Sequence, residues 1–145
     1  MDKKQLMEIL PHRDNMLLVD SAELVDGIAY GEKYITGDEF FLKGHFPDNP
    51  IVPGVILCEI MAQSACVLIA DGKTCCDNIT TLFTGLDKVR FKKQVHPGDT
   101  VKTVCSILKA KPPFYWATGK AFTDGELAAS AEFSFAVIPK DRYNC

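Results

Sequence analysis

The stretch VILCEIMAQSACVLIA, residues 55–70, runs for sixteen residues without a glycine or a proline, and Glu59 is its only charged residue. A run of this length favours a helix over a strand. Its side chains are apolar on almost every side, which is typical of a helix enclosed by other structure rather than one lying on a surface. We therefore expect one long, buried helix at the centre of the fold.

The segments on either side of this helix indicate what encloses it. Asp2 followed by KKQLMEIL predicts a short N-terminal helix that ends at Pro11. The turn signal Asp26-Gly27 predicts a hairpin over residues 17–35. Four alternating runs of strand length follow the helix, bounded by the turn sequences HPGD, KPP and TDGE, at residues 81–95, 100–110, 114–123 and 127–138.

An antiparallel sheet buries a central helix only by curling around it. We therefore predict an α+β fold in which a meander of long strands wraps the helix. The chain has 145 residues, 47% of them hydrophobic, and no internal repeat or linker, so we expect a single domain over residues 1–145.

Composition and charge exclude several classes of protein. A net charge of −3 and a pI near 5.6 argue against nucleic-acid binding, which normally requires a basic surface. The first twenty residues do not resemble a signal peptide, and no apolar run reaches the roughly 20 residues that span a bilayer. The six cysteines include no C-x-x-C pair, so we expect reduced thiols rather than disulfides or a metal site. We interpret the protein as cytoplasmic.

Three groups with chemical potential lie around the start of the central helix. Pro53 suits the first helical position, and Gly54 then presents a backbone N–H at the positive helix end, a donor for an oxygen that gains charge during a reaction. Glu59 lies among apolar residues without an evident basic partner within the helix, and burial penalises its charged form, so we expect a proton donor. His45, in the stiff loop GHFPDNP, is placed to act as a base.

Each of these residues also has an ordinary interpretation. A lone loop histidine is usually a hydrogen-bonded surface residue, and a helical glutamate is usually solvated. However, an unpaired acid in an apolar segment is costly unless it is used, and here a base, an oxyanion donor and an acid occur within fifteen residues. The combination favours an active site.

These residues belong to motifs with a specific resemblance. GHFP at 44–47, PGV at 53–55 and EIMAQ at 59–63 resemble the signature of the 3-hydroxyacyl-(acyl carrier protein) dehydratases of bacterial fatty acid synthesis, FabZ type. The resemblance extends over nearly the whole chain, through LPHRDNMLLVD at 10–20, GLDKVRFKKQVHPGD at 85–99 and DGELAASAEFSFAVI at 124–138.

The resemblance implies a hot-dog fold, in which an antiparallel sheet wraps one long helix. In this family two subunits join their sheets edge to edge, each active site combines the histidine of one chain with the glutamate of the other, and three dimers often form a hexamer. Carried over, His45 and Glu59 are the catalytic pair and the Gly54 N–H holds the thioester carbonyl. Glutamate at 59 favours the FabZ type over the related dehydratase-isomerase, which has aspartate there, although isomerisation of the product stays open.

The matching segments depart from the family pattern at a few positions, none of which removes a catalytic group. The chain reads HRDNMLLVD where relatives often read HRYPFLLVD, so Asp14, Asn15 and Met16 leave the acyl chain-length preference open. His12 matches a family position and is interpreted as structural, and His96 is interpreted as a surface residue.

The charge distribution indicates a partner. Residues 82–111 contain seven Lys or Arg against two Asp, a local charge of +5 in a chain of net charge −3. On a strand, Lys88, Arg90 and Lys92 share one face, and together with Lys93 they form a candidate docking site for an acidic acyl carrier protein. The alternative is an ordinary solvated face that protects a strand edge from aggregation.

The predicted reaction is the dehydration of a (3R)-3-hydroxyacyl thioester to the trans-2-enoyl thioester, with no metal or organic cofactor, because the thioester already acidifies C2. How His45 and Glu59 divide the proton transfers stays open. The alternatives are an acyl thioesterase on the same fold and a non-catalytic acyl-carrier-binding subunit.

Overall fold

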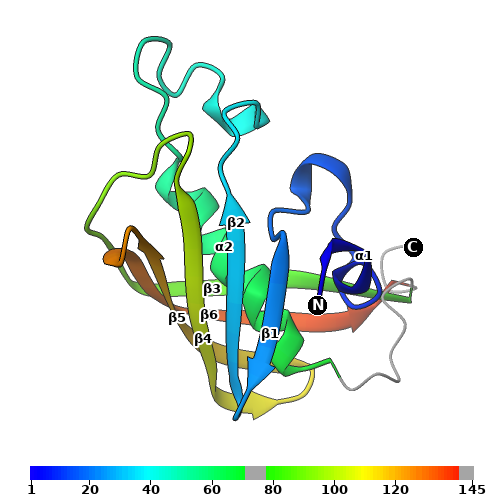
Figure 1. Cartoon of the computed structure of the whole chain (residues 1–145). Helices are drawn as coiled ribbons and strands as arrows, with labels where there is room; N and C mark the ends of the chain where they lie inside the picture. The colour runs from blue at the N-terminus through cyan, green and yellow to red at the C-terminus, as the bar shows by residue number, and fades with distance from the viewer. Residues whose placement is uncertain (71–77, 141–145) are drawn as a thin grey trace.

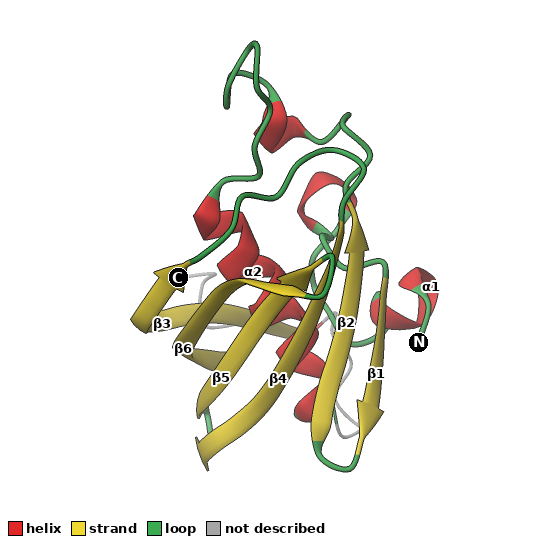
Figure 2. Cartoon of the chain, turned by 60° about the vertical axis from the view of Figure 1, so that its left-hand side comes forward, coloured by secondary structure: helices red, strands yellow, loops and turns green. Residues whose placement is uncertain are grey.

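A computed structural model describes residues 1–70 and 78–140 of the chain. The central helix α2 (Gly54–Ala65) continues into a single 3-10 turn, η3 (Cys66–Leu68). Leu57, Ile60 and Met61 of this helix are buried. Figures 1 and 2 show α2 lying in the hollow of a strongly curved sheet. The expected central helix wrapped by an antiparallel sheet is confirmed.

Six antiparallel strands form the sheet, in the spatial order β1-β2-β4-β5-β6-β3. Their bounds are β1 (Ser21–Val25), β2 (Ile28–Tyr34), β3 (Ile79–Phe91), β4 (Thr100–Lys111), β5 (Phe114–Thr123) and β6 (Glu126–Pro139). The predicted meander is correct for β4, β5 and β6 but wrong for β3, which pairs with β6 at the far edge. Alternation along a strand specifies its faces and not its neighbours, so the sequence pattern did not reveal this crossover.

The two Asp-Gly hairpin turns have the backbone that their sequences predict. Asp26 and Gly27 have φ of 50° and 78°, and Asp124 and Gly125 have φ of 51° and 74°. Positive φ at both central positions belongs to the turn type whose twist matches that of paired strands. These turns set the register of β1 against β2 and of β5 against β6.

The N-terminal helix is shorter than predicted. In α1 (Lys3–Leu6), Asp2 and Gln5 form a capping box, in which each side chain accepts the other's backbone N–H at 2.9 Å. The chain then turns, and the Arg13 guanidinium donates to the carbonyls of Met7 and Leu10 at 2.9 and 2.6 Å. The α-helical pattern ends at Leu6, because the next amides, of Glu8 and Ile9, donate to carbonyls three residues earlier.

Two strands approach α2 closely at glycine residues. A methyl group at Gly31 of β2 would collide with Ser64 Oγ, and one at Gly119 of β5 would lie 3.1 Å from Met61 Sδ. Ser64 Oγ in turn accepts a hydrogen bond from the buried Thr103 hydroxyl at 2.8 Å. The sheet thus packs backbone against helix, which fixes the position of α2 and of the groups it carries.

Three cysteines, Cys58, Cys66 and Cys105, are buried and free, as predicted for reduced thiols. Burial raises the pKa of Cys66 and of Cys105 to about 12. The expectation for Cys75, Cys76 and Cys145 lies outside the described residues. Within residues 1–70 and 78–140, no helix combines the length and the apolar character needed to cross a membrane.

Candidate active site

The segment between β2 and α2 extends beyond the end of the sheet and carries His45 (Figure 1). After the 3-10 turn η2 (Phe40–Leu42), Phe46 and Asn49 exchange two backbone hydrogen bonds of 3.1 Å and close a tight turn. The Phe46 ring stacks on the His45 ring, with the centroids 4.4 Å apart. Local contacts therefore hold the imidazole although much of the surrounding loop is exposed.

Two hydrogen bonds tie His45 to Ile51, just before α2. The Ile51 N–H donates to the His45 carbonyl at 2.8 Å, and His45 Nδ1 lies 2.9 Å from the Ile51 carbonyl oxygen. A carbonyl oxygen only accepts, so Nδ1 carries the hydrogen in this bond. Nε2 is then left with its lone pair, which is the form that a general base needs.

Gly54 is the first residue of α2, and Pro53 is its N-cap rather than the first helical residue that the sequence predicted. The Gly54 N–H is one of the groups at the helix start that have no partner within the helix. A Cβ atom at this position would lie 2.7 Å from the Phe91 ring. Only glycine fits between the helix end and β3 without displacing that ring.

His45 and Gly54 line the same open cavity, together with Phe91, Lys92 and Lys93. Its volume of about 630 Å³ lies in the range of ligand-binding sites. The structure thus brings the expected base and the expected oxyanion donor together, and it adds two lysines to the wall of the same cavity.

Glu59 lies elsewhere, at a second cavity lined by His12, Gln63 and residues of β3 and β6. Its Oε1 is 3.2 Å from His12 Nε2 and 3.0 Å from Gln63 Nε2. The sequence offers no basic partner for Glu59 within its own helix, and the fold supplies one from outside that helix. The partner comes from forty-seven positions earlier in the sequence, beyond the reach of an argument confined to one helix.

His12 is the functional candidate that sequence reasoning missed. It was interpreted as structural although it matches a family position. The signal available in the sequence was its place in the LPHR motif at residues 10–13, together with the absence of a nearby cation for Glu59. The pairing itself follows only from the three-dimensional structure.

No residue is common to the linings of the two cavities. Within the described part of one chain, His45 and Gly54 therefore belong to one cavity and Glu59 to the other. The three residues lie within fifteen positions of the sequence, yet the acid borders a different cavity from the other two. Residues 81–83 of β3 border the Glu59 cavity, whereas Phe91, at the other end of the same strand, borders the His45 cavity.

The four docking candidates do not form the simple strand face that alternation predicted. A β-bulge interrupts the pairing between Asp87 and Arg90, where Lys88 has φ of 49°, and β3 ends at Phe91, before Lys92. Alternation fails here because a bulge adds one residue to the strand. Lys88 lies 3.5 Å from Glu132 of β6, and the Arg90 guanidinium donates to the Val89 carbonyl at 2.9 Å.

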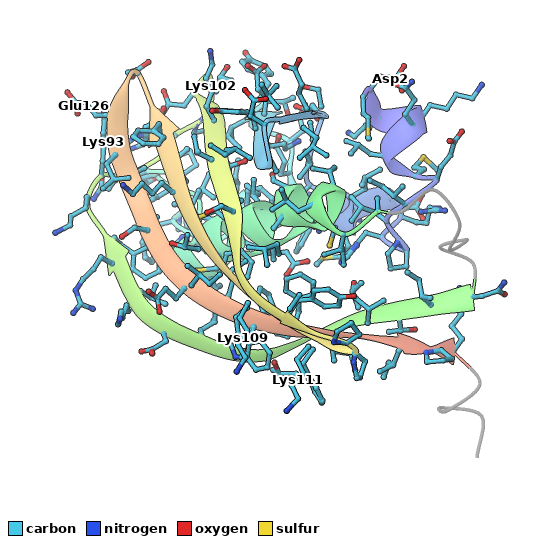
Figure 3. All side chains as sticks on the ribbon, turned by 90° about the horizontal axis from the view of Figure 1, so that it is seen from below. Asp2, Lys93, Lys102, Lys109, Lys111 and Glu126 are labelled. Carbon is cyan, nitrogen blue, oxygen red and sulfur yellow. The ribbon has the colours of Figure 1, made fainter. Side chains whose placement is uncertain are left out.

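Lys93 differs from Lys92 in having acidic neighbours. Its Nζ lies 3.0 Å from Glu126 and 3.9 Å from Asp124, at the turn between β5 and β6, and Figure 3 shows Lys93 beside Glu126. The hydrogen bond to Glu126 raises the pKa of Lys93. Lys109 and Lys111 lie at the opposite end of the sheet (Figure 3), so the local charge of +5 is spread over the molecule.

Residues 1–70 and 78–140 contain no group of three or more His, Cys, Asp and Glu side chains that could hold a metal ion.

A model of the FabA-like domain family matches residues 10–132 of the chain. A curated 3-hydroxyacyl-(acyl carrier protein) dehydratase FabZ from Staphylococcus haemolyticus is 43% identical over 138 residues, which are 94% of each chain.

Two solved structures share the fold. The dehydratase heterocomplex ApeI:P from Xenorhabdus doucetiae matches with a TM-score of 0.82 at 18% identity, over 95% of this chain and 93% of that one. A mutant thioesterase PA1618 from Pseudomonas aeruginosa matches with a TM-score of 0.69 at 12% identity, over 96% and 95%. The expected hot-dog fold is confirmed, and because the fold is common to a dehydratase and a thioesterase, it does not choose between those activities.

Proposed function

The chain belongs to the family of FabA-like domains, and from this premise we propose that it dehydrates (3R)-3-hydroxyacyl-(acyl carrier protein) to the trans-2-enoyl form in fatty acid biosynthesis. The observation that carries the proposal is the 43% identity to a curated dehydratase over almost the full length of both chains. The cavity that combines His45 with the Gly54 N–H supports it chemically.

We propose the following division of roles. His45 Nε2 removes the proton from C2, and the Gly54 N–H stabilises the negative charge that develops on the thioester oxygen. Glu59 donates a proton to the 3-hydroxyl, so that the C3–O bond breaks, water leaves and the C2–C3 double bond forms. The reaction is balanced without an oxidant, a reductant or a further reactant.

A complete site requires two chains in this proposal, because the base and the acid line separate cavities of one chain. Strand β3 lies at the edge of the sheet and runs from the Glu59 cavity to the His45 cavity. Antiparallel pairing of β3 with β3 of a second copy would set the start of each strand beside the end of the other. The Glu59 cavity of one protomer would then meet the His45 cavity of its partner.

The substrate is delivered by the acyl carrier protein, which is acidic, and Lys92 and Lys93 are the docking candidates that also line the His45 cavity. Lys88 and Arg90 are retained as weaker candidates because neither lines the His45 cavity. Free Cys58, Cys66 and Cys105 support a reducing compartment, and we propose that the protein is cytoplasmic.

One assay tests this proposal against its two alternatives. The protein is incubated separately with a 3-hydroxyacyl thioester and with a plain acyl thioester, and both enoyl absorbance and free thiol are followed. Dehydration predicts enoyl absorbance from the hydroxyacyl substrate without release of thiol. Free thiol without enoyl product would identify a thioesterase, and the absence of both signals would favour a non-catalytic carrier-binding subunit.

A further inference from the structure

The Glu59 carboxylate is held asymmetrically. His12 Nε2 and Gln63 Nε2 both lie within hydrogen-bond distance of the same oxygen, Oε1, at 3.2 and 3.0 Å. In the described part of the chain, no hydrogen bond or ion pair joins Oε2 to another residue. The two oxygens of the acid are therefore not equivalent.

The Gln63 amide is locked in one orientation. Its Oε1 accepts the Leu18 backbone N–H at 2.9 Å, and its Nε2 donates to the Met16 carbonyl at 2.7 Å. If the amide were flipped, its NH2 group would face the Leu18 N–H and its oxygen would face the Met16 carbonyl. Both contacts would be lost, which is costly for a side chain that is only 1% exposed. The second N–H of this amide must therefore point to Glu59, one helical turn earlier on the same face of α2.

The surroundings of Nδ1 indicate which ring nitrogen of His12 carries the hydrogen. His12 Nδ1 is buried and has no hydrogen-bond partner among the residues that the structure describes. A hydrogen on Nδ1 would be a buried donor without an acceptor, whereas a bare lone pair there is less costly to leave unmatched. The hydrogen therefore lies on Nε2, which donates to Glu59 Oε1.

We propose that His12 and Gln63 are positioning residues that commit Glu59 Oε1 to accepting hydrogen bonds, so that Oε2 is the oxygen that carries the proton to the substrate. If Oε1 carried the proton, that hydrogen would face the N–H groups of His12 and Gln63, which are both donors. When Oε2 releases its proton, the two donors stabilise the charge left on the carboxylate. This inference rests on the proposed function and specifies which atom of the acid acts.

Substitution at His12 tests the donor directly, because the His12 side chain is 19% exposed and tolerates change better than buried Gln63. The amide nitrogen of a glutamine matches the reach of Nε2, whereas that of an asparagine matches Nδ1. We expect His12→Asn to lower kcat about tenfold or more, the scale of one hydrogen bond to a charged group, with KM changed little. His12→Gln should recover most of the loss. His96→Asn, in the turn before β4, is the matched control and should behave as wild type.

Equal activity of the two His12 variants at an unchanged melting temperature would overturn the proposal, whether both were active or both inactive.

A second readout does not depend on turnover. In wild-type protein labelled with 15N-histidine, the imidazole spectrum should show the His12 hydrogen on Nε2, with a shift that changes in Glu59→Gln. A hydrogen on Nδ1, or no response to Glu59→Gln, would overturn the proposal. Failure of the dehydratase assignment is recognised separately, by the absence of enoyl product from wild-type protein.

Discussion

At the residue scale, the chemistry of His45 depends on one neighbour, the carbonyl oxygen of Ile51. Because this oxygen takes the hydrogen of Nδ1, Nε2 keeps the lone pair that a base requires. Glu59 shows the same dependence, since His12 and Gln63 occupy one of its oxygens. In the proposed mechanism, the side chain specifies the chemistry that is possible, and its contacts select the atom that would perform it.

His45→Ala and Glu59→Gln should each lower kcat by about two orders of magnitude or more, which is the usual contribution of a positioned acid or base. Neither side chain is fully buried, so both variants should retain the wild-type melting temperature. Steady-state kinetics with a 3-hydroxyacyl thioester provides the measurement. Near wild-type turnover by either variant would remove that residue from the mechanism.

The buried thiols should resist alkylation in the folded protein. With a pKa of about 12, Cys66 and Cys105 are almost entirely protonated at pH 8, and only the thiolate reacts. Peptide mapping by mass spectrometry after iodoacetamide treatment should find both unmodified in native protein and modified after unfolding. Rapid labelling of either cysteine in native protein would contradict the burial described here.

The same thiols should make the protein less stable in alkali. A raised pKa means that the folded state binds these protons more tightly than the unfolded state, whose thiols titrate near 9.0. The free energy of unfolding should therefore fall as pH rises from about 9 towards 12. Replacing Cys105 by alanine should reduce this pH dependence, which denaturant titration at several pH values would measure.

At the element scale, β3 carries the least regular part of the sheet. Its bulge at Lys88 and its end at Phe91 break the alternation on which the docking prediction rested. The result is a different arrangement of charge, in which Lys92 and Lys93 reach the wall of the His45 cavity. Lys93 is partly balanced by Glu126, so Lys92 is the better test of docking.

Lys92→Glu should raise KM for the carrier-bound substrate, because a basic side chain at the cavity assists the encounter with an acidic carrier. The difference from wild type should shrink as salt is added, since the Debye length is roughly 8 Å at physiological ionic strength. A small thioester without the carrier protein should be turned over equally by both proteins.

Lys111→Glu is the control, because it makes the same change of charge at the opposite end of the sheet. If both charge reversals raise KM equally, net charge rather than a docking site accounts for the effect. If Lys92→Glu slows the small thioester as well, the lysine acts in folding or in the site and not in docking.

At the scale of the whole molecule, the two separate cavities require an explanation that a single chain does not offer. In the proposed dimer, pairing of β3 with its copy joins them. Mixing inactive His45→Ala and Glu59→Gln proteins under conditions of subunit exchange should then restore activity. Half of the dimers would be mixed, each with one intact site of two, so the expected recovery is about a quarter of wild-type activity.

The control for this experiment replaces one partner by the double variant, which offers no intact histidine or glutamate to a mixed dimer. That mixture should stay inactive. Exchange itself is followed with differently tagged subunits. Demonstrated exchange without recovery of activity would mean that both catalytic groups come from one chain.

Much of the fold was predictable because it depends on local patterns. The apolar run at 55–70 specified a central helix, the alternating runs specified strands, and Asp-Gly pairs specified the tight turns. Each of these signals extends over a few residues, where backbone preferences and side-chain periodicity act directly. The sequence also supplied the candidates His45, Gly54 and Glu59, because they lie in one short motif, and their roles stay a prediction.

Tertiary structure decided the features that depend on residues far apart in the sequence. The position of β3 beside β6, the pairing of Glu59 with His12, and the separation of Glu59 from the His45 cavity all join distant segments. The bulge at Lys88 depends on how β3 fits β6. Periodicity describes which way a side chain points along its own element, whereas packing of the whole chain determines what that side chain meets.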